Sequence, residues 1–191
     1  MKLNIPNILT WLRIAMIPLV VGIYYLPDGW MTPETKNLTA AAFFAAAAVT
    51  DWFDGYLARA LNQTSAFGAF LDPVADKLMV AAALVVLVEL SRVNAVIALI
   101  IVGREITISA LREWMASIGE RKSVAVSFIG KLKTATQMVA ILLLLYHGPL
   151  AAGLDAQTAG TFLIYLAAFL TLWSMAYYLK MAAPQIMKAD A

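Results

Sequence analysis

The stretch "DWFDGYLARALNQTSAFGAFLDPVAD", residues 51–76, places four aspartates in a chain that is otherwise strongly apolar. Of the 191 residues, 62% are hydrophobic, only 14% are charged and none is cysteine. A chain of this composition has too little polar surface to cover a soluble globule of its size. We therefore interpret it as an integral membrane protein, in which four carboxylates in one short stretch need a special explanation.

Six apolar runs are each long enough to cross a bilayer as a helix, which takes about 20 residues. The runs lie at 8–26, 38–56, 70–90, 93–115, 128–146 and 158–179. Lipid offers no hydrogen-bond partner to an open backbone, so each run is expected to be helical. The predicted fold class is an all-α integral membrane protein, a six-transmembrane-helix bundle in which residues 1–191 form one membrane-embedded domain.

The Lys and Arg residues are unevenly distributed among the predicted loops. Most lie in the second and fourth connections, near the two termini, or at the start of the fifth run: Lys2, Arg59, Arg112, Arg121, Lys122, Lys131, Lys133, Lys180 and Lys188. The opposite loops hold only Lys36 and Arg92. By the positive-inside rule, both termini and the even-numbered connections face the cytoplasm. We expect membrane lipids as surroundings and no nucleic-acid partner.

Helical spacing arranges the aspartates into two stripes. One face of the second run carries four residues that lie three to eight positions after Asp51, namely Asp54, Gly55, Ala58 and Arg59. The next run carries a stripe with a spacing of four, namely Gly68, Asp72 and Asp76. The turn at 62–65 is short and polar, so the two runs are expected to be antiparallel neighbours. The stripes would then face one another near the cytoplasmic surface.

Four carboxylates in one small volume repel one another, and each is costly to remove from bulk water. Two divalent cations would balance four negative charges, and ligands that are all oxygen favour Mg²⁺ or Mn²⁺ over zinc. Paired metal sites of this kind assist phosphate chemistry by holding the attacking and leaving oxygens. On the same face, Gly55 and Ala58 leave space for a substrate, and Arg59 can reach a phosphate.

The complete order D-x2-D-G-x2-A-R-x8-G-x3-D-x3-D over residues 51–76 resembles the signature of the CDP-alcohol phosphatidyltransferases. The resemblance implies a six-helix membrane bundle, usually a homodimer, that transfers a phosphatidyl group from CDP-diacylglycerol to an alcohol and releases CMP. It also implies roles for the four aspartates. Asp51, Asp54 and Asp72 would hold metal, and Asp76 would both contact metal and act as the base.

The opening "NIPNILTWLRIAMIP", residues 4–18, is similar to the members of this family that use sn-glycerol 3-phosphate as the acceptor. Asn7, Thr10 and Arg13 are spaced along one side of the first helix. Asn7 could also cap that helix, and Arg13 could extend to the lipid headgroups. The expected CDP-diacylglycerol site comprises these three residues and part of the motif, namely Asn7, Thr10, Arg13, Asp51, Gly55, Ala58, Arg59 and Gly68.

Two further segments, "GREITISALREW" at 103–114 and "GKLKTATQM" at 130–138, resemble the same group of family members. Their cations suit an acceptor that carries a phosphate, because a dianion that approaches an acidic metal site needs positive charge of its own. Arg112 and Lys131 are the first candidates for this contact, followed by Arg104 and Lys133. A buried ion pair with Glu105 is the alternative role of Arg104, and the positive-inside rule explains Arg121 and Lys122 better than it explains Lys131.

Other functions are compatible with parts of the pattern. A family member with another acceptor, serine or an inositol phosphate, would share the aspartate motif. Membrane prenyltransferases also bind metal-pyrophosphate through aspartates, but they resemble longer chains with two separated motifs. An ion-coupled transporter would use intramembrane acids, although internal repeats and interrupted helices are not evident here. His147, the only histidine, is expected at the opposite membrane interface.

Overall fold

The computed structural model describes the backbone of residues 5–60, 66–119, 128–150 and 153–189. Within these ranges, side chains are described except at 5–6, 52, 54–60, 66–67, 69, 128–129, 131 and 185–189. The described chain consists of six α-helices, one short 3₁₀ segment and connecting turns, and its only β-type pairing is an isolated bridge between Pro149 and Asp155. The prediction of an all-α protein is confirmed.

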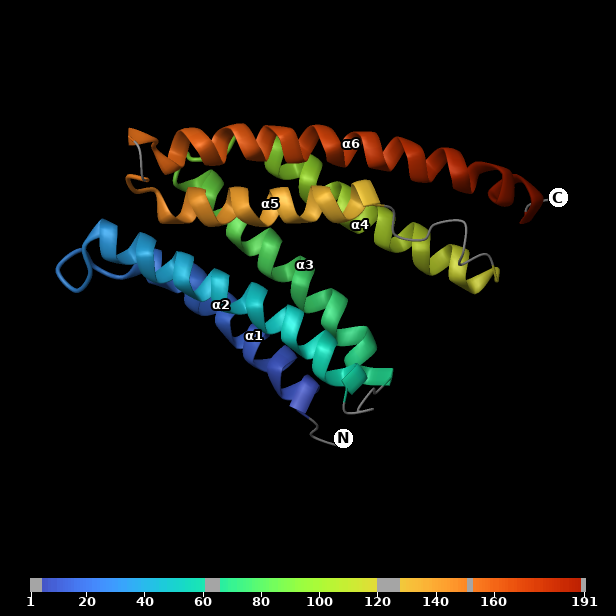
Figure 1. The fold of residues 1–191 in the computed structure, drawn as a ribbon, viewed down its shortest axis with the longest axis horizontal. Helices are drawn as coiled ribbons and strands as arrows, with labels where there is room; N and C mark the ends of the chain where they lie inside the picture. The colour runs from blue at the N-terminus through green and yellow to red at the C-terminus, as the bar shows by residue number, and fades with distance from the viewer. Residues whose placement is uncertain (1–4, 61–65, 120–127, 151–152, 190–191) are drawn as a thin grey trace.

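Each of the six predicted runs coincides with one helix. The elements are α1 (Ile5–Gly22), η1 (Ile23–Tyr25), α2 (Pro33–Ala60), α3 (Ala66–Glu89), α4 (Ala95–Ser117), α5 (Phe128–Tyr146) and α6 (Ala156–Ala189) (Figure 1). The prediction for α5 matches both ends, whereas α2 and α6 extend well beyond their apolar runs. Hydropathy measures only the apolar part of a helix, and α2 and α6 continue through polar residues such as Glu34 and Lys180.

Side-chain caps set the beginnings of three helices. The Thr32 hydroxyl accepts from the backbone N–H of Thr35 at 3.3 Å, and Pro33 then occupies the first turn of α2, where a missing N–H costs nothing. Asn94 Oδ1 accepts from the backbone N–H of Val96 at 2.8 Å to begin α4. Asp155 Oδ2 accepts from that of Thr158 at 3.2 Å at the beginning of α6. These local signals fix where the helices start but not how they pack.

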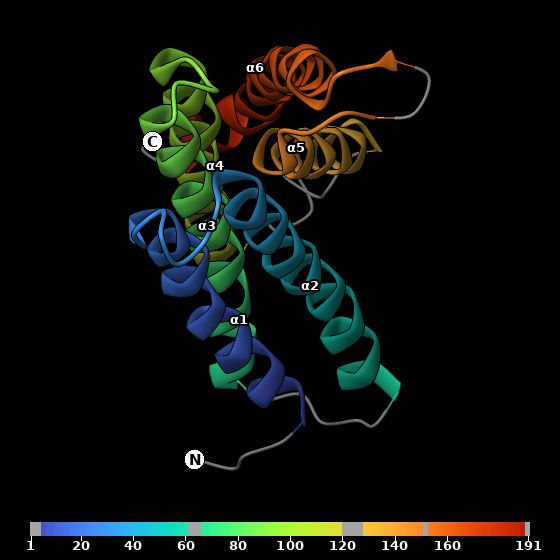
Figure 2. The same cartoon turned by 90° about the vertical axis from the view of Figure 1, so that its left-hand side faces the viewer.

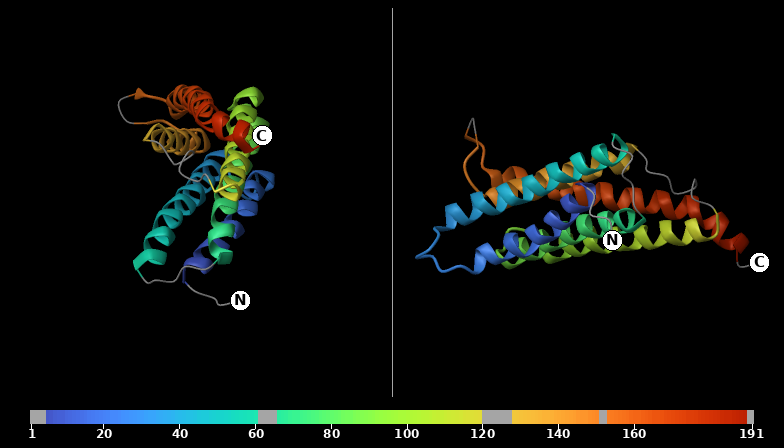
Figure 3. Two further views of the ribbon diagram at one scale, coloured as in Figure 1. Left: turned by 90° about the vertical axis from the view of Figure 1, so that its right-hand side faces the viewer. Right: turned by 90° about the horizontal axis from the view of Figure 1, so that it is seen from below.

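The helices form two groups. In the first, α1 packs against both α2 and α3, and in the second, α6 packs against α5 and α4; contacts of α2 with α5 and of α3 with α4 join the groups. Figures 1 and 2 show the first group extending obliquely away from the layer of α5 and α6. Consecutive helices run in alternating directions. The η1 loop and the α5–α6 connection therefore lie at one end of the molecule, and the last turns of α6 lie at the other (Figure 3).

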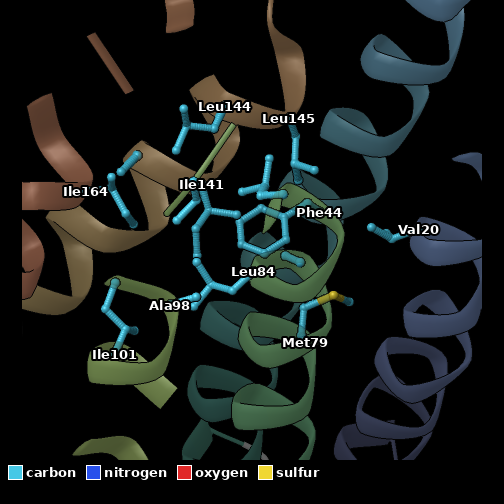
Figure 4. Packing of buried hydrophobic residues seen from close by; sticks show 14 of the residues in the cluster. Val20, Phe44, Met79, Leu84, Ala98, Ile101, Ile141, Leu144, Leu145 and Ile164 are labelled. Carbon is cyan, nitrogen blue, oxygen red and sulfur yellow. The ribbon is translucent and has the colours of Figure 1, made fainter. Parts of the chain in front are cut away.

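The main apolar core lies where the two groups meet. Phe44 of α2, Met79 and Leu84 of α3, and Ile141 of α5 are all nearly inaccessible to solvent and point toward one another (Figure 4). The alanine tract before Asp51 supplies the buried small residues Ala40, Ala41 and Ala47. Small side chains let helix backbones approach closely, which is the packing role that the sequence predicts for this tract.

Gly160 of α6 lies close against Leu144 of α5. A Cβ atom at this position would lie 2.7 Å from Leu144 Cγ and 3.2 Å from the Leu144 backbone nitrogen. We expect Gly160→Ala to lower the free energy of unfolding in detergent by about 1–3 kcal/mol, because the two helices would have to separate. Gly103→Ala is the matched control, since a Cβ there meets nothing within 4 Å. Equal thermal midpoints for the two variants would contradict this packing.

Arg92, in the connection between α3 and α4, joins helices at the end of the molecule that contains η1. Its guanidinium donates to the backbone oxygens of Leu144 and Leu145 at 3.0 and 3.2 Å, and to Asn37 Oδ1 at 2.8 Å. It thus satisfies carbonyls in the last turn of α5, which have no partner within the helix. Burial lowers the pKa of Arg92 from its ordinary value, and the nearby Tyr24 opposes this shift. Arg92 therefore has a structural role at this end.

Among the residues that the structure describes, two helical segments are long and apolar enough to cross a bilayer by length and composition, Asn7–Tyr25 and Ala156–Pro184. A third described segment, Leu132–Tyr146 of α5, is apolar but shorter. Many large apolar side chains are nevertheless solvent-exposed on the described surface, such as Leu99 (71%), Phe162 (70%) and Val85 (65%). Extensive apolar surface of this kind is typical of a protein that contacts membrane.

Candidate active site

The aspartate motif meets α1 at Arg13. One nitrogen of its guanidinium, Nη1, lies 2.8 Å from Asp51 Oδ1, 3.1 Å from Asp72 Oδ1 and 2.7 Å from Asp76 Oδ1. Arg13 itself is only 1% exposed. Among the described residues, α1 packs against α2 and α3 more extensively than these two pack against each other. Asp51 of the first stripe and Asp72 and Asp76 of the second therefore face one another across an arginine from the first helix.

The positions of Asp51, Asp72 and Asp76 show whether their carboxylates could bind a metal cation. Three oxygens from two helices converge on a single nitrogen atom, which shows that they can surround one positive centre. One guanidinium compensates only one of three carboxylates, so the cluster retains room for further positive charge. Among the described side chains, no group of three or more His, Cys, Asp or Glu is already spaced to bind a metal ion. The donor set fits a divalent cation in its chemistry, and Arg13 lies at its centre.

Some of the predicted motif residues lie outside the described side chains. They are Asp54, Gly55, Ala58 and Arg59, all in the last turns of α2, together with Lys131 in the first turn of α5. Their roles stay predictions. Gly68 is described and lies on α3, one helical turn before Asp72.

The three candidates on the first helix share one buried face. Asn7, Thr10 and Arg13 are 4%, 3% and 1% exposed, and they follow one another at a spacing of three residues. Asn7 lies within the first turn of α1 rather than ahead of it. The alternative that Arg13 extends to the lipid headgroups is wrong, because its guanidinium is buried among carboxylates. The side of α1 that carries Asn7, Thr10 and Arg13 is therefore buried, and its Arg13 contacts the aspartates.

Arg104 and Arg112 lie two turns apart on α4 and both approach Tyr178 of α6. Their guanidinium carbons lie 5.9 and 5.4 Å from the centre of the Tyr178 ring, within the range of cation–π attraction. Arg104 also donates to Ser174 Oγ at 3.0 Å. The Nε atoms of both arginines are buried and have no hydrogen-bond partner among the described residues. Helix α6 therefore positions two cations that retain unused donors.

Lys133 has a different environment from the other predicted acceptor residues. It is completely buried, and its ammonium forms an ion pair with Glu105, which in turn lies 3.4 Å from Nη1 of Arg104. Its charge is therefore matched by Glu105, which lines the cavity described below. This pair joins α4 to α5.

A cavity of about 510 Å³ brings the acidic and basic residues together. Its walls come from five helices, α1 to α5, and include Arg13, Asp51 and Asp76 together with Arg104 and Arg112. Such a volume is typical of a small-molecule site. A cavity with carboxylates at one part of its wall and guanidiniums at another can hold a cation-bound pyrophosphate beside an anionic acceptor.

The residues of this cavity lie within a segment of the chain that matches a known family. The family model for CDP-alcohol phosphatidyltransferase matches residues 3–173, which include every residue of the cavity.

The chain belongs to the CDP-alcohol phosphatidyltransferase family.

Curated relatives are similar over nearly the whole length. The CDP-diacylglycerol–glycerol-3-phosphate 3-phosphatidyltransferase of Escherichia coli strain K12 is 49% identical over 189 residues, which cover 98% of this chain and 99% of the relative. The protein of the same name from Salmonella choleraesuis strain SC-B67 is 50% identical over 184 residues, covering 95% and 96%. The chain is therefore an enzyme, a transferase of the CDP-alcohol phosphatidyltransferase family.

Sequence reasoning missed several polar residues of this phosphatidyltransferase cavity. Lys77, Ser109 and Gln137 all line it, and the Lys77 ammonium donates to Ser109 Oγ. Tyr178 lies behind the two arginines of α4. A lysine directly after Asp76 and a glutamine within an apolar run were available signals, because polar side chains in such runs usually face the bundle interior. For Tyr178 no such signal exists, since tyrosines are common at many positions of membrane helices.

Proposed function

We propose that the chain transfers the phosphatidyl group of CDP-diacylglycerol to sn-glycerol 3-phosphate and releases CMP and phosphatidylglycerophosphate, a step of phospholipid biosynthesis. The observation that carries this proposal is the single cavity in which Asp51 and Asp76 lie with Arg104 and Arg112. Carboxylates alone would suit many metal-dependent reactions. Arginines in the same cavity favour an acceptor that carries its own phosphate.

Asp51, Asp72 and Asp76 would hold divalent metal together with Asp54. Two ions of Mg²⁺ or Mn²⁺ would match the four carboxylates, and when bound they would neutralise the charge that develops on the pyrophosphate oxygens. Three of these carboxylates are held in one place by the packing of α1 against α2 and α3. Their positions are therefore set before a substrate arrives, which is the condition for electrostatic catalysis.

The CDP-diacylglycerol would lie along α1, α2 and the beginning of α3. The buried polar face of α1, with Asn7, Thr10 and Arg13, borders the carboxylates and offers hydrogen-bonding groups to the nucleotide. Arg13 can exchange a carboxylate for a phosphate oxygen, because its planar guanidinium suits both. From the motif, Gly55, Ala58 and Gly68 would leave room for the substrate and Arg59 would contact a phosphate.

The acceptor would enter from the side of α4 and α5. Its phosphate would be bound by Arg112 and Lys131, with Arg104 and Lys133 contributing positive charge. In the transfer step, a terminal hydroxyl of glycerol 3-phosphate gives its proton to Asp76 as its oxygen attacks the phosphorus that bears diacylglycerol. A new P–O bond forms to the acceptor, the P–O bond to CMP breaks, and CMP leaves with the electron pair.

In the cell, we propose a multi-pass protein of the bacterial cytoplasmic (inner) membrane, with six spans and one domain over residues 1–191. Both termini and the active site would face the cytoplasm, where Lys and Arg are concentrated. The exposed apolar side chains support contact with membrane lipids. A homodimer is proposed from the family resemblance.

The acceptor is tested by CMP release from purified protein in detergent with CDP-diacylglycerol and Mg²⁺. We expect release only when sn-glycerol 3-phosphate is added, and none after the metal is removed with EDTA. Restoration by Mg²⁺ or Mn²⁺ controls for damage during chelation. Release with serine or an inositol phosphate in place of glycerol 3-phosphate would contradict the acceptor and leave the family unaffected.

A further inference from the structure

Lys77, Ser109 and Gln137 are polar residues of the cavity that have no part in the mechanism above. Lys77 follows Asp76 on α3, and its ammonium donates to Ser109 Oγ on α4. Gln137 lines the same cavity from α5. These residues come from three helices that the chain brings together only in the folded bundle, and each offers hydrogen-bonding groups in a largely apolar surrounding.

Lys77 and Ser109 form a hydrogen-bonded pair in the wall of the cavity. Lys77 adjoins the expected base, Asp76, in the chain. Ser109 lies one turn after Glu105 and one turn before Arg112, and all three line the cavity from one face of α4. Since Lys77 follows Asp76 and Ser109 precedes Arg112 by one turn, an acceptor with one hydroxyl at Asp76 and its phosphate at Arg112 would place the middle of its carbon chain near this pair.

The side chain of Gln137 indicates which chemical group the middle of the acceptor contains. It is only 2% exposed, and its Oε1 atom is buried with no hydrogen-bond partner among the described residues. Burying a polar atom without a hydrogen-bond partner costs free energy, so a hydrogen-bond donor from a bound ligand would stabilise this oxygen. An ionised phosphate has no proton to donate. A hydroxyl can donate to Gln137 and at the same time accept from Lys77 or Ser109.

We propose that Gln137, Lys77 and Ser109 form a subsite for the hydroxyl that the acceptor retains after transfer, the C2 hydroxyl of glycerol 3-phosphate. The subsite selects phosphorylated acceptors that have two neighbouring hydroxyls. This inference rests on the proposed function and adds specificity determinants to it. A site built to bind a hydroxyl rejects an analogue without it, because its own polar groups would then be buried unpaired.

The experiment compares two acceptors, sn-glycerol 3-phosphate and 3-hydroxypropyl phosphate, which lacks only the C2 hydroxyl. CMP release gives kcat/KM for both, in the wild type and in the variants Gln137→Met and Ser109→Ala. We expect the wild type to prefer glycerol 3-phosphate by at least about tenfold, corresponding to one hydrogen bond. In both variants the ratio should fall to about two or less, because only the rate with glycerol 3-phosphate decreases.

Thr136→Ala is the matched control, because the Thr136 hydroxyl bonds to Leu132 O within its own helix and Thr136 does not line the cavity. It should keep the wild-type ratio. Equal kcat/KM for the two acceptors in the wild type, or losses that are the same for both acceptors in both cavity variants, would refute the subsite while CMP release still supports the proposed function. No CMP release with either acceptor in the wild type would overturn the proposed function and the subsite together.

Discussion

Asp76→Asn is expected to lower kcat for CMP release by about a thousandfold, because asparagine has no oxygen basic enough to take the acceptor's proton. Asp76 lines the cavity, and its Oδ1 lies 2.7 Å from Nη1 of Arg13. The amide keeps the size of the side chain and one acceptor oxygen. Binding of CDP-diacylglycerol should therefore persist, somewhat weakened, and a single-turnover assay should show a slow chemical step.

Asp155→Asn is the matched control for this change. Asp155 caps α6 at the α5–α6 connection and does not line the cavity, and asparagine caps a helix about as well as aspartate. The control should retain nearly the full rate. If Asp76→Asn kept a tenth or more of the wild-type kcat, Asp76 could not be the base. If it released no CMP and had also lost binding of CDP-diacylglycerol, its role would be to organise the site.

For Arg112→Gln, we expect kcat/KM for glycerol 3-phosphate to fall by about a hundredfold, mostly through KM. The reason is the loss of a charge-assisted contact to the acceptor's phosphate in a desolvated cavity. Tyr178 holds the Arg112 guanidinium at 5.4 Å from its ring, so the cation is positioned before the acceptor binds. Arg112→Lys should recover only part of the loss, since an ammonium lacks the planar pair of donors.

Lys180→Gln removes the same charge from an exposed position on α6, outside the cavity. It should leave KM for glycerol 3-phosphate unchanged, which would separate a specific contact from a general effect of net charge. The affinity for CDP-diacylglycerol should be similar in both variants. An equal rise of KM in Lys180→Gln and Arg112→Gln would show that long-range electrostatics, and not the contact of Arg112, accounts for the effect.

Arg13 illustrates how far a local pattern reaches. The sequence predicted a substrate contact for Arg13, and its spacing with Asn7 and Thr10 identified a face of α1 that is buried in the structure. The partners of Arg13 could not be predicted from nearby residues in the sequence. Four carboxylates predicted a compensating cation, and we expected metal alone; the structure adds a guanidinium from a helix that precedes the motif by some forty residues. Only the packing of α1 against α2 and α3 makes that contact possible.

The basic residues show the same division. The segments at 103–114 and 130–138 were singled out together, but their members differ in the folded chain. Arg104 and Arg112 line the cavity, whereas Lys133 forms an ion pair with Glu105. Lys133 and Gln137 both belong to the buried side of α5, yet only Gln137 lines the cavity. Helical periodicity groups residues on a face, but it does not tell which neighbour meets each turn of that face.

By itself, the sequence determined that the protein is helical, where the six described helices lie, and to which family the motif at 51–76 assigns the chain. These properties depend on composition, on spacing along one helix and on capping residues, all of which act over a few turns. The tertiary structure decided that Arg13 lies among the aspartates, that Arg104 and Arg112 share their cavity, and that the buried Gln137 oxygen has no hydrogen-bond partner among the described residues. Each of these depends on how helices distant in the chain pack, and that packing is a property of all their side chains together.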